Sequence, residues 1–111
     1  MSTFKDIAKA KFKEKLASIG EFYVEEWETT VYFKPMTMKE MGVLEESRMS
    51  SNSPEIVVDN VIARARDQDM SLLFKRVERL ELLREYNPDT LADISIAMTK
   101  WDVELKESAG N

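Results

Sequence analysis

The stretch that decides the fold is GEFYVEEWETTVYFKP, residues 20–35. It is rich in β-branched and aromatic residues, the types that fit the pleated surface of a sheet. The sequence predicts two short strands, 21–25 and 29–34, that pair as a β-hairpin around Glu26–Glu28. Pro35 ends the second strand, because proline has no N–H for the ladder.

Before the hairpin, the spacing of apolar residues predicts an amphipathic helix over roughly 3–19. The apolar residues that recur at helical spacing are Phe4, Ile7, Ala8, Phe12, Leu16 and Ile19. Five lysines make this helix basic. We expect Gly20 to end it, because glycine takes the left-handed conformation without steric cost.

After the hairpin, three capping signals predict further helices. Thr37 and Glu40 form a Thr-x-x-Glu capping box. Ser53-Pro54-Glu55 and Asn87-Pro88-Asp89 each place a capping residue before a proline and an acid. The last helix has the most regular apolar stripe, formed by Leu91, Ile94, Met98, Trp101 and Leu105. A loop is expected at 50–53.

The predicted fold class is therefore mainly α with a small β-hairpin (α+β), as a single compact domain, 1–111, of about four to five helices. Its parts are the N-terminal basic amphipathic helix (1–19), the hairpin (21–34), a helical part (37–104) and a frayed tail (105–111). Within the helical part, Leu72–Phe74 are three apolar residues in a row. They form either an extended plug or the first turn of the next helix.

The composition excludes several classes of function. The chain has no histidine and no cysteine, so most metal sites, most nucleophilic hydrolases and all thiol chemistry are excluded. Five lysines against two acids give residues 1–16 a charge of +3, and the net charge of −5 leaves −8 for the remainder. This acidic body disfavours nucleic acid as a partner. With no apolar stretch near about 20 residues, we expect a cytoplasmic protein that does not bind membranes.

Two groups of acids are candidates for carboxylate chemistry. Asp67 and Asp69 form an Asp-x-Asp, and Glu25, Glu26 and Glu28 gather at the hairpin turn. Neither group has the spacing of a calcium loop. The favoured interpretation is a solvated acidic surface, with no catalytic, cofactor-binding or metal residues and no cofactor.

Apolar side chains are the remaining candidates for a binding site. The predicted partner-binding residues are Phe4, Phe12, Met36, Met38 and Met41. Methionine is flexible and polarisable, so it adapts to varied partners, although filling gaps in the core between the hairpin and the next helix is the more common role of such residues. Trp27 and Trp101 are expected first as core anchors. The predicted self-association residues are Lys9, Lys11, Lys13 and Lys15, on the basic helix.

One family resemblance adds to these inferences. VEEWETTVYFKPMTMKEM, residues 24–41, resembles the opening of the small tail assembly chaperones of long-tailed (siphovirus-type) bacteriophages, and residues 31–37 carry most of the match. The later helices and the Leu72–Phe74 segment follow in the same order, so the resemblance covers roughly 20–100. Asp67–Ser71 lacks the glycine often found at that place in the family.

The resemblance implies a non-catalytic protein that acts during viral tail morphogenesis. Such chaperones coat the tape measure protein, keep it soluble and hand it over as tail tube subunits polymerise. The implied partners are the tape measure protein, further copies of the chain in a ring or spiral, and the tail tube protein. The implied location is the host bacterial cytoplasm, with none in the mature virion.

The function predicted from the sequence is therefore a tail assembly chaperone, a late protein that binds tape measure protein as a homo-oligomer. A monomeric phage or bacterial regulatory adaptor that binds one protein partner stays open as an alternative. A carboxylate-dependent enzyme using Asp67 and Asp69 is the third and least favoured option.

Overall fold

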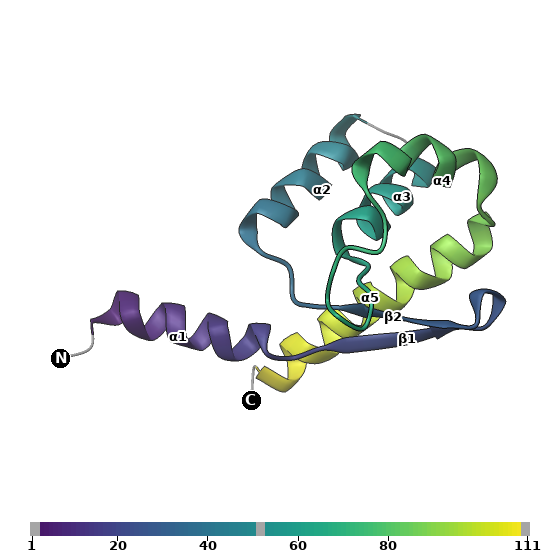
Figure 1. Ribbon diagram of the computed structural model, residues 1–111. Helices are drawn as coiled ribbons and strands as arrows, with labels where there is room; N and C mark the ends of the chain where they lie inside the picture. Colours follow the sequence, from purple (N-terminus) through teal and green to yellow (C-terminus); the bar gives the residue numbers. More distant parts are fainter. Residues whose placement is uncertain (1–2, 51–52, 110–111) are drawn as a thin grey trace.

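The computed structural model describes residues 3–50 and 53–109 of the chain. In these residues it has five α-helices, two short 3₁₀ turns and one antiparallel hairpin (Figure 1), so the predicted mainly helical α+β class is confirmed. The elements in chain order are α1 (Phe4–Leu16), β1 (Gly20–Val24), η1 (Glu25–Trp27), β2 (Thr29–Phe33), α2 (Met38–Ser50), α3 (Ser53–Arg64), η2 (Arg76–Glu78), α4 (Arg79–Glu85) and α5 (Pro88–Ala109).

The hairpin forms within one residue of the predicted strand bounds. Gly20 lies opposite Phe33 and Val24 opposite Thr29 in the antiparallel register. The connection is the 3₁₀ turn η1 followed by Glu28 with a φ of 49°. A residue in this left-handed region reverses the chain without an Asn-Gly turn.

The prediction that Gly20 ends the first helix is wrong. α1 ends at Leu16, and its C-cap residue Ala17 has right-handed angles, φ −72° and ψ −16°. Gly20 is instead the buried first residue of β1. A Cβ atom on it would lie 2.7 Å from Cδ2 of the Phe33 ring. Glycine is needed here because the ring lies against the backbone, not because the backbone has a positive φ.

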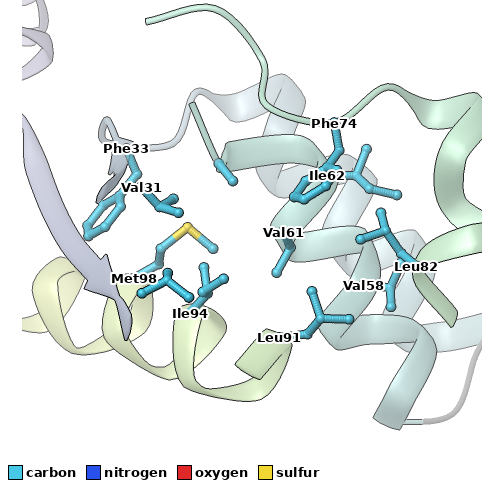
Figure 2. Packing of buried hydrophobic residues seen from close by; sticks show 12 residues of the cluster. Val31, Phe33, Val58, Val61, Ile62, Phe74, Leu82, Leu91, Ile94 and Met98 are labelled. Atoms are coloured by element: carbon cyan, nitrogen blue, oxygen red, sulfur yellow. The ribbon is translucent and has the colours of Figure 1, made fainter. Parts of the chain in front are cut away.

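The core lies between the hairpin and the helices α3, α4 and α5 (Figure 2). Its buried apolar residues are Val24, Val31, Phe33, Val58, Val61, Ile62, Ala65, Phe74, Leu82, Leu91, Ile94 and Met98. The predicted stripe of the last helix supplies the final three of these. α5 packs against both α3 and β1, while α2 packs on α3.

Both tryptophans pack against this core, as predicted. The Trp27 ring makes edge-to-face contacts with Phe74 at 6.0 Å and with Tyr86 at 5.9 Å between centroids. Trp101 contacts Phe33 in the same way at 5.3 Å. Such geometry stabilises aromatic pairs beyond their burial, so the rings attach the hairpin and its turn to the helices.

The segment after α3 is not helical, so the alternative of a first helical turn at Leu72–Phe74 is wrong, and of these three residues only Phe74 is buried. Arg66 and Tyr32 exchange two backbone hydrogen bonds of 2.9 and 2.8 Å, which adds a bridge to the edge of β2. The Leu73 N–H donates to Ala65 O at 2.9 Å. Phe74 is then buried in the core.

Buried charges hold α3 to its neighbours. Asp59 is buried on α3, and Arg79 at the start of α4 donates to its two carboxylate oxygens, from Nε at 2.6 Å and from Nη2 at 3.2 Å. The hydrogen bond to Asp59 raises the pKa of Arg79. The pair is a structural link between α3 and α4, since a buried carboxylate needs such a partner.

The predicted capping signals are confirmed at α2 and α5. Thr37 Oγ1 accepts from Glu40 N at 3.2 Å, and Glu40 Oε1 accepts from Thr37 N at 2.9 Å. Asn87 Oδ1 accepts from Asp89 N at 3.0 Å. Of the predicted loop 50–53, Ser50 and Ser53 are helical and residues 51–52 lie outside the described residues.

The tail predicted to fray, 105–111, is helical as far as Ala109, and residues 110–111 lie outside the described part. Its fraying in solution stays a prediction.

α1 projects away from the rest of the molecule (Figure 1). The radius of gyration is 15.2 Å and the extents are 54 × 32 × 25 Å, whereas a compact chain of this length has a radius of about 13 Å. The described side chains of α1 are all exposed. The helix forms because Thr3 caps it in a box with Asp6, and its apolar residues have no buried place in a single copy.

No helix in residues 3–50 and 53–109 combines the length and the apolar character needed to cross a bilayer.

Candidate partner-binding surface

Four of the five predicted partner-binding residues are exposed. On α1, Phe4 is 80% exposed and Phe12 is also exposed. On α2, Met38 is 84% exposed and Met41 is exposed beside it, whereas Met36 before the helix is half-buried. Figure 1 shows α1 and α2 apart, so these residues form two separate apolar surfaces on one copy. Their role in binding stays a prediction.

The position of the α2 methionines follows from the local sequence. Pro35 is buried at the end of β2, and the Thr37–Glu40 capping box fixes the first turn of the helix. Residues three apart in a helix share a face, so Met38 and Met41 project together. The result is a soft apolar surface at a well-fixed helix start.

The α1 surface mixes apolar and basic groups. Phe4 and Phe12 are eight residues apart, and Lys11 and Lys15 follow Phe4 by seven and eleven positions. At about 3.6 residues per turn, all four project to one side of the helix. A partner for this side must therefore supply both apolar area and carboxylates.

The same geometry places the other two predicted self-association residues elsewhere. Lys13 follows Phe4 by nine positions and projects from the opposite side of α1, whereas Lys9 is three positions before Phe12 and lies on the flank beside it. All four lysines are exposed. Lys11 and Lys15 are therefore the two lysines that share a side of α1 with Phe4.

Sequence reasoning missed two grooves, because each is built from elements far apart in the chain. One is a mainly apolar depression of about 470 Å³ between α3, α4 and α5. It is lined by Pro54, Val57, Val58, Leu82, Leu83, Arg84, Tyr86, Pro88, Asp89, Leu91 and Ala92. The other, of about 450 Å³, lies between β1 and α5. Its lining residues are Glu21, Phe22, Phe33, Asp93, Ile96, Ala97, Lys100, Trp101 and Glu104.

Of the Asp67–Asp69 pair, the Asp67 side chain has structural contacts. Asp67 Oδ1 accepts from Asp69 N at 2.9 Å and from Ser71 N at 3.1 Å, which closes the turn after α3. Among the residues that the structure describes, no group of three acidic side chains is placed to hold a metal ion.

At the hairpin turn, Glu26 is more than a solvated acid. Its Oε2 accepts from Asn87 Nδ2 at 2.9 Å and also from the Thr90 hydroxyl. These contacts attach the turn to the first residues of α5. Glu26 is also exposed, so the predicted solvated acidic surface and this link to α5 hold together.

Comparison with known proteins gives one structural likeness. No protein-family model and no curated protein sequence matches the chain. Its structure is similar to that of the bacteriophage HK97 tail assembly chaperone, with a TM-score of 0.58 and 19% identity over 89% of this chain and 96% of that one. The chain has the fold of a phage tail assembly chaperone. The predicted resemblance is thereby confirmed for the fold.

The likeness extends beyond residues 20–100, on which the sequence resemblance was based. Its 89% coverage takes in most of the chain. At 19% identity, few residues are shared with the HK97 tail assembly chaperone, so the binding surfaces must be argued from this chain's own side chains.

Proposed function

We propose that this chain is a non-catalytic phage tail assembly chaperone that binds and solubilises the tape measure protein during tail morphogenesis. The likeness of its fold to the HK97 tail assembly chaperone is the observation that carries the proposal. The exposed apolar side chains of α1 and α2 add to it. A tape measure protein is long and largely helical, and its bare apolar faces would aggregate without a cover.

The α2 methionines are proposed as the contact with the tape measure protein. Met38 and Met41 lie on the surface, so they are free to pack against varied apolar side chains. Each such contact is weak. Many copies along one tape measure polypeptide supply many such contacts at high effective concentration. A chaperone of this size therefore acts as an assembly.

Self-association is proposed through α1. Its lysines, Lys9, Lys11, Lys13 and Lys15, face an acidic body on a neighbouring copy, so copies join head to tail in a ring or spiral. The assembly acts as a late product in the host cytoplasm, meets the tail tube protein when the tape measure protein is handed over, and is absent from the mature virion.

Co-expression with the tape measure protein tests the proposal. Met38→Glu with Met41→Glu places charges on the α2 surface and is expected to abolish co-purification of the tape measure protein. Val77→Glu with Leu80→Glu is the matched control, because Val77 and Leu80 have the same spacing and are 85% and 55% exposed outside α2. If the methionine variant still co-purifies with the tape measure protein, the α2 surface is not the contact. If the unmodified chain does not co-purify with it, the proposed function is wrong.

A further inference from the structure

We infer that the groove between β1 and α5 receives helix α1 of a second copy of this chain. The inference rests on the self-association in the proposed function and names the surface that accepts the helix. It follows from three properties of the groove and of α1: their chemical character, their length and their place on the chain.

The floor of the groove is aromatic and apolar. Phe33 is buried beneath it, and the edge-to-face contact with Trp101 fixes both rings. Ile96 lies on α5 with 64% of its surface exposed, and Phe22 of β1 is half-buried. An exposed isoleucine beside two half-buried aromatic rings is apolar area that a partner helix can cover.

The rim of the groove is acidic. Glu21, Asp93 and Glu104 are exposed around the apolar floor, and Lys100 is the one cation among the lining residues. The exposed side of α1 presents Phe4 and Phe12 together with Lys11 and Lys15. An apolar and acidic groove therefore meets an apolar and basic helix, so the charges attract on contact.

The two surfaces also match in length. From Phe4 to Lys15 the helix advances about 17 Å, at about 1.5 Å per residue. Asp93 and Glu104 are the same number of residues apart on α5 and both line the groove, so its acidic ends are separated by the same rise. The helix is thus long enough to lie along the groove, with Lys11 and Lys15 near the carboxylates at one end.

The occupant is a second copy because α1 projects away from its own body. Donor and acceptor are different surfaces of one chain, so each copy has one free helix and one free groove. A contact of this kind is heterologous and continues from copy to copy. The α3–α4–α5 groove lacks this match, since Arg84 and Asp89 give it no net charge.

Charge reversal on each side provides the test. The donor variant is Lys11→Glu with Lys15→Glu, and the acceptor variant is Glu21→Lys with Glu104→Lys. All four side chains are exposed, and circular dichroism confirms that each variant is folded. In case the strand position is sensitive, Glu104→Lys alone is a second acceptor variant. Sedimentation velocity of the full chain then gives the size of the assemblies.

We expect each variant alone to associate at least about tenfold more weakly than the unmodified chain, because exposed ion pairs become repulsive pairs. An equal mixture of the donor and acceptor variants should regain large assemblies of alternating copies, because the reversed helix of one variant matches the reversed groove of the other. A chain with all four reversals should recover the large assemblies. The control Lys39→Glu with Lys75→Glu carries the same charge change on two exposed lysines outside α1 and the groove, and should assemble normally.

Several outcomes would overturn the inference. They are acceptor variants that assemble like the unmodified chain, a control that is as weak as the donor variant, or an unmodified chain that stays monomeric because α1 folds onto its own groove. Solubility of the tape measure protein is measured separately with the unmodified chain. If one of these outcomes occurs while the unmodified chain still solubilises the tape measure protein, this inference alone is contradicted. An unmodified chain that does not solubilise the tape measure protein contradicts the proposed function.

Discussion

The guanidinium of Arg64 binds the carboxylate of Asp102 through two hydrogen bonds, 2.7 Å from Nη1 and 2.8 Å from Nη2. Arg64 is only 2% exposed, and its Nη2 also donates to Lys34 O at 3.0 Å. One side chain at the end of α3 thereby holds α5 and the end of β2. Lys34 precedes α2 and α5 lines the β1–α5 groove, so this side chain helps to position both.

Asp102→Asn is expected to lower the free energy of unfolding by about 2–3 kcal/mol, because it leaves a buried cation without its anion while Asp102 itself is partly exposed. Urea denaturation measures the change. Replacing both partners, Arg64→Met with Asp102→Leu, should cost less than Asp102→Asn, since no uncompensated charge remains. A double variant that is less stable than Asp102→Asn would contradict this account of the ion pair.

Gly20→Ala and Gly42→Ala test the finding that Gly20, at the start of β1, is needed because the Phe33 ring lies against it. The added methyl at Gly20 meets the Phe33 ring, so we expect a loss of about 1–3 kcal/mol from overpacking. At Gly42, inside α2, a Cβ atom has nothing within 4 Å, so alanine should stabilise by about 0.5–1 kcal/mol. Thermal unfolding of both variants checks the opposite signs; equal effects would show that Phe33 does not restrict Gly20.

Met98 and Met38 lie at opposite extremes of burial, so their alanine variants should differ in the free energy of unfolding. Met98 is fully buried, so Met98→Ala should cost about 2–5 kcal/mol through the cavity it leaves. Met38 is on the surface, and Met38→Ala should change stability by less than about 0.5 kcal/mol. Denaturant midpoints give both values. A large loss at Met38 would mean that α2 buries this side chain.

Salt should weaken the proposed assembly. Raising the ionic strength from about 0.1 M to about 1 M shortens the Debye length from about 10 Å to about 3 Å, which screens exposed charge pairs. The average mass from light scattering should then fall for the unmodified chain. Assemblies that keep or gain mass at high salt would show that the charges on α1 do not drive association.

The sequence predicted the features that depend on neighbours along the chain. The strand bounds, the Thr37–Glu40 box and the Asn87 cap are local signals, and each forms where the pattern placed it. The apolar stripe of α5 was also readable, because helical periodicity marks a buried face.

The errors and omissions share a physical cause, which is packing between distant residues. Gly20 was interpreted as a helix stop because its contact with Phe33 crosses the hairpin and leaves no local signal. The bond from Asn87 to Glu26 joins residues 61 positions apart. Both grooves require α5 to lie against elements far away in the sequence, so no spacing rule could have found them.

The most direct test of the central claim is the turbidity of a tape measure protein fragment diluted from denaturant into increasing amounts of this chain. If the chain covers apolar helices of the tape measure protein, turbidity falls steadily to the buffer baseline, and the Met38→Glu, Met41→Glu variant leaves it high. Turbidity that is the same with and without the unmodified chain would contradict the account.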